Sequence, residues 1–313
     1  MTTVRSVRLL ASAALAGVFL LAGCGGSDQG PSSDTSSTGS GAASADLPTA
    51  SGEFGEAPTL TFPDGDAPTD LQVEVLSEGD GAVVDPGAAV AASYLGQVWG
   101  SDTSFDESYS RGKPSLFSLS SVVAGWTQGI PDHTVGSRLL ISIPPDLGYG
   151  EDGNAQAGIG GEDTIVFVVD IVTAYNVGDT GQADAQVVTD PAQLPVTIEG
   201  ALGAPATFTV NAGAAAPAEA QLIRIADGTG ETTAAGQQVA VAFVATYWDN
   251  TGTESSWTPS EGSVGGPLVS NLGGGTVFDL AIGVPVGSRV LLTALASADS
   301  PALVVLVDIL GVV

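Results

Sequence analysis

The sequence predicts an α+β protein made of two copies of one unit, each an antiparallel β-sheet curled around one short helix. Three observations lead to this expectation. The chain repeats itself, β-branched runs bounded by Gly, Pro and Asp make most of each copy strand, and a single segment has helical spacing. A length of 313 residues leaves room for about two such domains.

The internal repeat is strongest at the start of each copy. Residues 68–99 match residues 217–248 without gaps, at an offset of 149. The block Val-Gly-Ser-Arg at 135–138 then recurs at 286–289, at an offset of 151. Self-similarity of this kind indicates one structural unit used twice.

The repeat also fixes the expected domain boundaries. Val-Val-Asp-Ile at 168–171 recurs as Leu-Val-Asp-Ile at 306–309, where the offset has fallen to 138, so the second copy lacks 13 residues before this block. We expect one domain over 58–175 and a second over 193–313, joined by a Gly/Asp/Ala/Gln linker at 176–192.

Strands dominate the first copy. Apolar and polar residues alternate over 71–75, which is typical of a half-buried strand. The segments 90–98, 138–143 and 164–172 are rich in Val and Ile and are bounded by turn residues, so each is predicted to be a strand.

One segment, 121–130, has helical spacing instead. Its apolar residues fall on one face at that spacing: Val122, Val123, Trp126 and Ile130. We expect Ser120 or Ser121 to cap this helix, because a serine hydroxyl can accept from the first free backbone amides.

The charge balance excludes some classes of function. The chain has 7 Lys and Arg against 35 Asp and Glu, a net charge of −28. Such a surface repels phosphate backbones, so no nucleic-acid partner is expected. A single Cys cannot form an intramolecular disulfide, and a single His excludes a His-rich metal site within one chain.

The N-terminus has the pattern of an export signal. Arg5 and Arg8 precede an apolar run over 9–21, which at 13 residues is too short to span a bilayer. The run ends in Leu-Ala-Gly-Cys, which resembles the lipobox of bacterial lipoproteins and implies that residues 1–23 are a signal peptide and that Cys24 is lipidated. The alternative is an ordinary signal peptide with a chance Cys. We expect a lipid anchor on the extracytoplasmic face of a bacterial cell membrane.

A tether is expected to follow the anchor. Residues 24–57 are mostly Gly, Ser, Thr, Ala and Asp, with almost nothing large and apolar. Such a segment buries too little surface to offset its ordering entropy, so it is predicted to be disordered.

The first copy carries a dense set of motifs. It contains Phe-Asp at 105–106, Val-Val-Ala-Gly-Trp at 122–126 and Leu-Gly-Tyr-Gly at 147–150. Around these stand Val90, Tyr94, Gly96, Arg111, Pro114, Phe117, Ile159 and Phe167. Taken together, residues 58–175 resemble the FKBP-type peptidyl-prolyl isomerases, and the chain is therefore expected to hold tandem FKBP-like domains.

The resemblance implies a proline-binding pocket with assigned roles. Trp126 would form its floor, Phe105 one wall, and Asp106 and Tyr149 its polar groups, and these four residues are the predicted catalytic set. The remaining predicted substrate-binding residues are Tyr94, Val122, Val123, Ile159, Phe167 and Arg111, with Arg111 expected to pair with Asp106 or Tyr94. The alternative is that these aromatic side chains only fill a core.

Isomerisation at proline suits such a pocket. An X–Pro amide crosses a barrier of about 18–20 kcal/mol that partial double-bond character sets. Charge separation falls in the twisted transition state, which a dry apolar pocket favours over the planar amide. No nucleophile, metal or cofactor is needed, so none is expected.

Some residues depart from the family pattern. Ser115 stands where an apolar or aromatic residue is usual, and Gly160-Gly161 replaces the usual Pro-Pro after the flap isoleucine. The segment between Leu119 and Val122 is two residues shorter than usual. Because Gly160-Gly161 stands in place of Pro-Pro, the loop after Tyr149 is expected to be looser.

The second copy is expected to fold without the pocket. The 13 missing residues correspond to those around Tyr149 and Ile159, and Glu-Ser-Ser-Trp at 254–257 stands where Phe105-Asp106 would map. Phe278 is expected to take the place of Trp126, and Trp248 and Trp257 to pack in the core.

The leading hypothesis is a membrane-anchored isomerase that acts on X–Pro bonds of exported proteins through its first domain. The alternative is a non-catalytic chaperone or scaffold lipoprotein that binds proline-containing polypeptides. A solute-binding lipoprotein is disfavoured because that class usually has two larger α/β lobes, which the helix-poor pattern does not supply.

Overall fold

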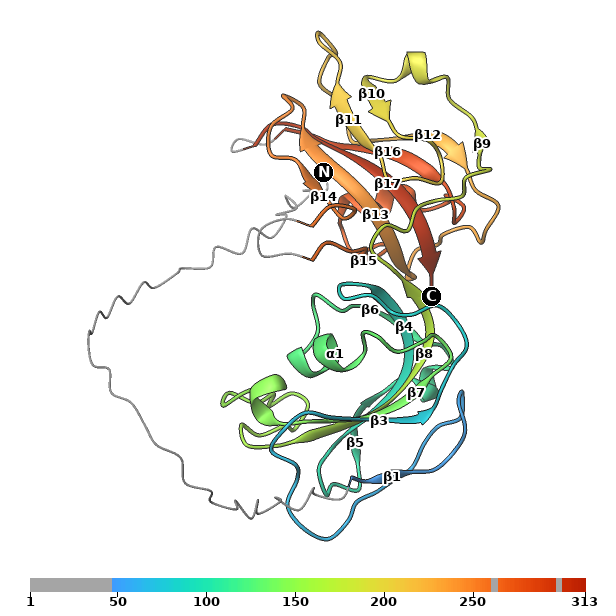
Figure 1. The fold of residues 1–313 in the computed structure, drawn as a ribbon. Coiled ribbons are helices and arrows are strands. Elements are labelled where there is room, and N and C mark those ends of the chain that lie inside the picture. The colour runs from blue at the N-terminus through green and yellow to red at the C-terminus, as the bar shows by residue number, and fades with distance from the viewer. Residues whose placement is uncertain (1–46, 260–263, 297–299) are drawn as a thin grey trace, which may run out of the picture.

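The computed structural model describes residues 47–259, 264–296 and 300–313. The described chain forms two large antiparallel sheets, one in each half (Figure 1). We call residues 47–175 the first unit and the described residues of 176–313 the second unit.

The first sheet has the strand order β3-β7-β8-β4-β5, and β6 pairs with the other end of β4. Its strands are β3 (Gln72–Ser77), β4 (Ala89–Val98), β5 (Ser104–Glu107), β6 (Ser115–Ser118), β7 (Arg138–Ile143) and β8 (Ile165–Tyr175). All of the predicted strands of this unit are present, with shifts of at most three residues at their ends.

The second sheet has the order β14-β13-β17-β16-β12-β9, and β15 pairs with β13. Its strands are β9 (Gln186–Val187), β12 (Gln221–Asp227), β13 (Gln238–Tyr247), β14 (Glu254–Ser255), β15 (Leu268–Asn271), β16 (Arg289–Ala294) and β17 (Leu303–Val312). Apart from β9, this order is that of the first sheet read through the sequence repeat.

A short hairpin accompanies each sheet. In the first unit β1 (Thr49–Ala50) pairs with β2 (Leu60–Thr61), and in the second β10 (Val196–Glu199) pairs with β11 (Thr207–Val210). Leu60 of the first hairpin packs with Leu140, Val166 and Val168 on one face of the sheet, while alternate residues of the same strands form the larger core cluster on the other. Because both faces are covered, all six residues of β7 are buried.

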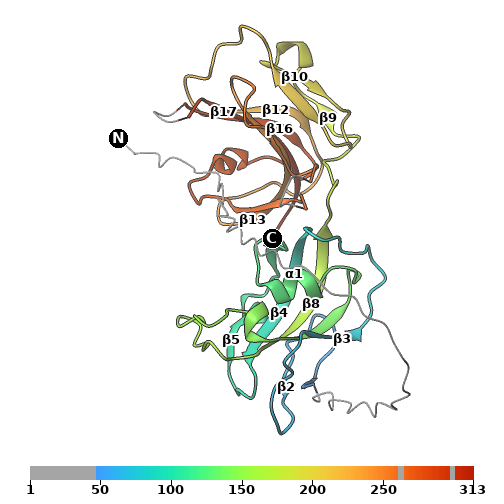
Figure 2. The same ribbon diagram turned by 60° about the vertical axis from the view of Figure 1, so that its left-hand side comes forward.

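The single α-helix of the described chain, α1 (Ala124–Gly129), lies on the concave face of the first sheet (Figures 1 and 2). It is shorter than the predicted 121–130. The predicted serine cap is wrong: Val123 is the capping residue and no side chain bonds the helix start, because Ser121 is held in a turn by the Ser118 carbonyl. The helix is instead fixed by burial of Trp126.

Short 3₁₀ helices complete the fold: η1 (Tyr109–Arg111), η2 (Pro145–Leu147), η3 (Pro191–Gln193) and η4 (Val277–Ala281). We expected one short helix inside each curled sheet. Within the described residues, only the first unit has an α-helix there. In the second unit η4 occupies this place, where Asp279 accepts from the Gly273 and Gly275 amides and so holds a tight turn.

The predicted tether is wrong in its last part. Residues 47–57 are ordered: β1 lies here, the Gly55 amide donates to Asp170 at 2.7 Å, and the carbonyls of Gly52 and Glu56 accept from Arg138 at 2.8 and 2.7 Å. The signal peptide 1–23, Cys24 and the tether up to residue 46 lie outside the described residues.

From Asp179 on, the predicted linker 176–192 is likewise built into the second unit, whereas Asn176 bonds Val83 and Asp85 of the first. Its residues 186–187 form β9 against β12, and the Gly181 amide donates to the Asp308 carboxylate at 2.8 Å. The Gln182 amide donates to the Gly287 carbonyl at 2.8 Å. These contacts use backbone amides and one buried carboxylate, so composition alone gave no sign of them.

A buried ion pair crosses the first sheet. Arg138 on β7 donates from Nε to Asp170 Oδ1 of β8 at 2.6 Å, and both side chains are almost fully buried. The second unit repeats the arrangement with Arg289 and Asp308, also at 2.6 Å. In each unit the guanidinium also donates to two loop carbonyls, so the buried charge has its hydrogen bonds satisfied.

No helix within 47–259, 264–296 or 300–313 is long and apolar enough to cross a bilayer.

We predict that Asp170→Asn lowers the free energy of unfolding by about 3–5 kcal/mol, because it leaves Arg138 charged and uncompensated in the core. Urea or guanidinium unfolding measures this. The matched control is Asp227→Asn, which breaks the more exposed pair with Arg224 at the same 2.6 Å and is expected to change stability by less than about 1 kcal/mol. Equal effects of the two substitutions would contradict the role given to burial.

Candidate active site

A cavity of about 760 Å³ opens on the concave face of the first sheet. It lies between the strands and the segment that joins β7 to β8. Its lining comes from four strands (β4, β5, β6 and β8), from two connecting segments and from α1. It consists of Tyr94, Phe105, Asp106, Phe117, Ser121, Val122, Val123, Trp126, Tyr149, Asn154, Gln156, Ala157 and Phe167.

Trp126 is the centre of the aromatic part of this cavity. Its ring contacts Phe117, Phe167 and Tyr94 edge-on, with centroids 5.1, 5.2 and 5.7 Å apart. Edge-to-face geometry is favourable for aromatic pairs and fixes their relative orientation. Trp126 is 3 % exposed, and its indole N–H has no hydrogen-bond partner among the described residues.

The Phe105 and Phe167 rings, which form two walls of the cavity, can contact each other because Gly96 of β4 lies between them. A Cβ at Gly96 would lie 2.6 Å from the Phe105 ring and 2.7 Å from the Phe167 ring. These two rings meet edge-on with centroids 5.5 Å apart. A side chain at this position would collide with both rings, so glycine permits their contact.

A polar group stands at the rim of the cavity. The Tyr94 hydroxyl donates to Asp106 at 2.5 Å and accepts from Arg111 at 3.0 Å, while Arg111 also pairs with Asp106 at 3.3 Å. Burial, then the hydrogen bond to Asp106, raises the pKa of Tyr94 to about 12. The tyrosine therefore stays neutral at physiological pH and holds the carboxylate in a fixed position.

Tyr109 anchors the short helix from which Arg111 projects. Its hydroxyl donates to the buried carboxylate of Asp170 at 3.0 Å. Burial, then the charge of Asp170, raises the pKa of Tyr109 well above its ordinary value. The buried ion pair of the fold is thus linked through η1 to the rim of the cavity.

The loop between β7 and β8 covers one side of the cavity with Tyr149, Asn154, Gln156 and Ala157. Asn154 and Ile159 bond each other through both backbone groups, at 2.8 and 3.0 Å. The Gly160 amide donates to Asp163 at 2.7 Å, so a side chain holds this turn where the family pattern would use proline. The Tyr149 hydroxyl has no partner within the described chain.

Eight of the ten predicted site residues line the cavity: Tyr94, Phe105, Asp106, Val122, Val123, Trp126, Tyr149 and Phe167. Ile159 instead packs in the core cluster beneath the loop, at 4 % exposed. Arg111 bonds two lining residues without lining the cavity itself. Ser115 is part of this polar group, since its hydroxyl accepts from Arg111 at 3.3 Å.

Five lining residues were not predicted: Phe117, Ser121, Asn154, Gln156 and Ala157. Phe117 belongs to the motif that carries the family resemblance, so the motif could have assigned it to the pocket, where its ring contacts Tyr94 with centroids 5.3 Å apart. The last three lie in the 21-residue connection 144–164, whose counterpart 295–302 is thirteen residues shorter in the second unit.

The second unit keeps the framework of this site but not its side chains. Ser256 accepts from the Phe243 amide at 2.7 Å, as Ser108 accepts from Tyr94 at 2.8 Å. Phe278 lies in η4 and packs in the same core cluster as Phe243. Trp257 is 8 % exposed and packs in the core as predicted, whereas Trp248 is only partly buried and packs against the cluster that contains Trp257.

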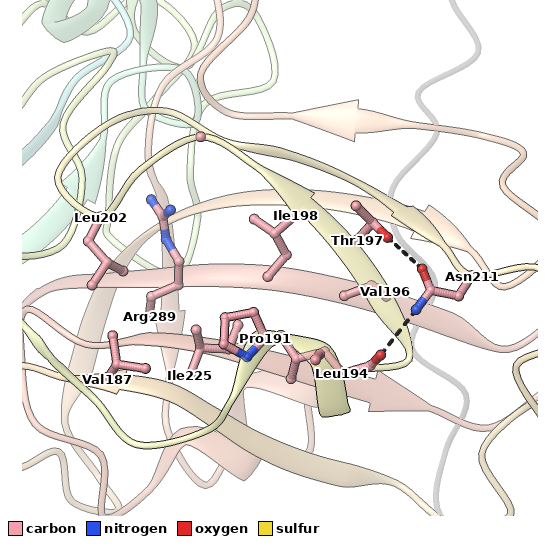
Figure 3. Close-up of a pocket in the computed structure, with 12 residues that line it drawn as sticks. Val187, Pro191, Leu194, Val196, Thr197, Ile198, Leu202, Asn211, Ile225 and Arg289 are labelled. Atoms are coloured by element: carbon pink, nitrogen blue, oxygen red, sulfur yellow. Dashed lines mark hydrogen bonds between the residues drawn. The ribbon is translucent and has the colours of Figure 1, made fainter.

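A separate cavity of about 450 Å³ lies between the β10–β11 hairpin and the second sheet (Figure 3). Most of its lining is aliphatic. Its polar side chains already have partners: Asn211 bonds Thr197 and the Leu194 carbonyl, and Arg289 bonds Asp308. No group in this lining is arranged for chemistry.

Comparison with known proteins shows which family the first unit resembles. The family described as "FKBP-type peptidyl-prolyl cis-trans isomerase" matches residues 81–172. The "Probable FK506-binding protein" of Corynebacterium glutamicum is 38 % identical over 119 residues, which are 38 % of this chain and 99 % of that protein. This chain belongs to the FKBP-type peptidyl-prolyl cis-trans isomerase family.

Other relatives match the same region. The "FK506-binding protein" of Streptomyces anulatus is 38 % identical over 119 residues, covering 37 % of this chain and 96 % of that protein. The isomerase FkpA of Escherichia coli strain K12 is 34 % identical over 122 residues, covering 39 % of this chain and 43 % of that protein. The cavity of the first unit therefore lies in the part of the chain that carries the FKBP family match.

We predict that this FKBP-type chain loses stability as the pH rises from 10 to 12, because the fold raises the pKa of Tyr94 to about 12 and so favours the neutral phenol. The stabilisation is complete below the ordinary value of 10.0 and is lost as the pH rises through the folded value. Urea unfolding across this range measures the loss. Tyr94→Phe is expected to reduce the slope, with Tyr109 supplying part of what remains; an unchanged slope would contradict the assignment.

Proposed function

We propose that the protein is a peptidyl-prolyl cis-trans isomerase whose active site is the aromatic cavity of the first unit. The observation that carries this proposal is the convergence of Trp126, Phe167 and Tyr94 with the rim carboxylate of Asp106 around one open cavity. The alternative that these rings merely fill a core is disfavoured, because they surround about 760 Å³ of open space.

The residues present suit rotation about an X–Pro bond. The proline ring enters between aromatic side chains over Trp126, and its amide is removed from bulk water. Rotation reduces the polarity of the amide, so an apolar surrounding stabilises the twisted form more than the planar one. Catalysis then comes from this difference in binding, and every group it needs belongs to the chain itself.

The polar groups orient the peptide beside the proline. Asp106 is held by Tyr94 and Arg111 and is half-exposed at the rim, so it can face the backbone of an incoming peptide. Tyr149 lines the cavity with an unpaired hydroxyl that can donate to a substrate carbonyl. In this proposal Asp106 and Tyr149 position the peptide, and the aromatic walls contact the proline ring.

We further propose that the activity belongs to the first unit only and that the second is a degenerate copy of it. The common strand order, the repeated Arg–Asp pair and the equivalent serine bonds support a shared origin. The shorter β16–β17 connection supports loss of the site, because its counterpart supplies four lining residues of the cavity.

The place of action proposed is the extracytoplasmic face of a bacterial cell membrane. The export signal and the Leu-Ala-Gly-Cys motif that ends in Cys24 support a lipid anchor, and residues 25–46 would extend the catalytic unit from the bilayer. Proline-containing segments of exported polypeptides are then the substrates.

We predict that the purified protein accelerates cis-trans isomerisation of a proline peptide in a protease-coupled assay. Asp106→Ala and Trp126→Phe are each expected to lower kcat/KM about tenfold, since about 1.4 kcal/mol of transition-state stabilisation accounts for that factor. The controls are Asp66→Ala and Trp248→Phe, which change the same residue types outside the cavity and are expected to leave kcat/KM unchanged.

Two outcomes would contradict the proposal. A folded protein that binds the peptide without accelerating its isomerisation would favour the non-catalytic chaperone or scaffold instead. A loss of activity in Trp248→Phe equal to that in Trp126→Phe would contradict restriction of the activity to the first unit.

We predict that Cys24→Ser moves the protein expressed in a bacterial host from the membrane fraction to the soluble fraction, because the serine cannot carry the acyl chains that hold it at the bilayer. Detergent phase partition and intact mass measure the change. Ser27→Ala, which alters a neighbouring residue, should leave the protein in the membrane. Retention of Cys24→Ser in the membrane would show that the anchor lies elsewhere.

A further inference from the structure

The second unit touches the first on a strand that forms part of the active-site wall. β6 (Ser115–Ser118) pairs with β4 on one side only. On its other side Leu116 directs both backbone groups at the second unit. The Leu116 amide donates to Gln238 Oε1 at 3.0 Å, and Gln238 Nε2 donates to the Leu116 carbonyl at 3.3 Å.

We propose that Gln238 is a positioning residue for the isomerase site: the second unit holds β6, and thereby the Phe117 wall, through the amide side chain of Gln238. This inference rests on the proposed function, and it gives the second unit a role in catalysis although it supplies no residue to the cavity.

Gln238 is itself rigidly placed. It is the first residue of β13, where it pairs with Asn271 of β15. Its backbone amide donates to the Val313 carbonyl at 3.1 Å, and its backbone carbonyl accepts from the Val313 amide at 3.0 Å. A side chain on so fixed a backbone can act as a rigid clamp, because little conformational freedom remains to be lost when it bonds Leu116.

An apolar cluster surrounds the two hydrogen bonds. Leu116 is 2 % exposed and packs with Ala89 and Ala91 of β4 and with Ala240 of β13. Tyr175, at the end of β8, covers Gly311 so closely that a Cβ at Gly311 would collide with the Tyr175 hydroxyl. The two units are therefore packed on each other at β6 rather than joined only by the chain between them.

Successive side chains of β6 face the interface with the second unit and the active site in turn. Because successive side chains of a strand point to opposite faces, Leu116 faces the second unit while its neighbours face the site. Phe117 lines the cavity and meets the rings of Tyr94 and Trp126 at 5.3 and 5.1 Å. Ser115 accepts from Arg111, which holds Asp106. A shift of Leu116 would thus move both an apolar wall and the polar rim.

The test is Gln238→Leu in the full chain, which removes both hydrogen bonds at similar side-chain volume. Gln221→Leu is the matched control, because Gln221 is exposed on β12, away from β6. We expect the Leu116 amide to lose its protection from hydrogen exchange and the indole N–H resonance of Trp126, assigned with Trp126→Phe, to shift. We expect KM for a proline peptide to rise about fivefold while kcat changes less than twofold, as for a binding wall that is no longer held.

A second variant guards against misfolding. Gln238→Glu keeps an acceptor for the Leu116 amide but replaces the donor with an oxygen facing the Leu116 carbonyl, so it should shift the Trp126 resonance and raise KM in the same direction. If either the Trp126 resonance or KM keeps its wild-type value in folded Gln238→Leu and Gln238→Glu, the proposal is wrong. Should the wild-type protein itself lack isomerase activity, the proposed function fails, and the Kd of the same peptide replaces KM in deciding this proposal.

Discussion

The buried pair between Arg138 and Asp170 is the interaction on which the first unit depends. Asp170 accepts from Arg138, from the Gly55 amide and from the Tyr109 hydroxyl, so one carboxylate joins two central strands, the N-terminal segment and the short helix beside the cavity. Two charges this deeply buried are tolerated only when all of their hydrogen bonds are made. The requirement explains why segments of unremarkable composition, 47–57 and 176–192, are ordered around the equivalent pairs.

The same requirement separates what could be predicted from the sequence from what could not. Strands of the first unit and eight site residues follow from local pattern and motif, since each is encoded by side chains close together in the chain. The ordering of 47–57 could not be predicted, because it depends on backbone groups of Gly52, Gly55 and Glu56 that carry no compositional signal. The clamp of Leu116 by Gln238 joins residues 122 positions apart, which no local pattern reports.

The comparison of the two units shows how a site is lost while a fold is kept. Both units keep the sheet, the buried Arg–Asp pair and a serine hydroxyl that accepts from a backbone amide of β4 or β13. What differs is the connection between two neighbouring strands and the residues at the start of β5 and β14. Loops can change with little effect on the core, whereas the buried framework cannot, so binding surfaces diverge first.

The edge of β6 that pairs with no other strand has a consequence for solubility. A strand with unpaired backbone groups at its edge can pair with a strand of another polypeptide, which is a route to aggregation. An isomerase that acts on unfolded chains, as proposed above, would meet such strands constantly. Here the outward amide and carbonyl of Leu116 are already occupied by Gln238 of the same molecule, and the surrounding alanines are covered. The contact between the two units therefore also closes the strand against self-association and against capture by misfolded neighbours.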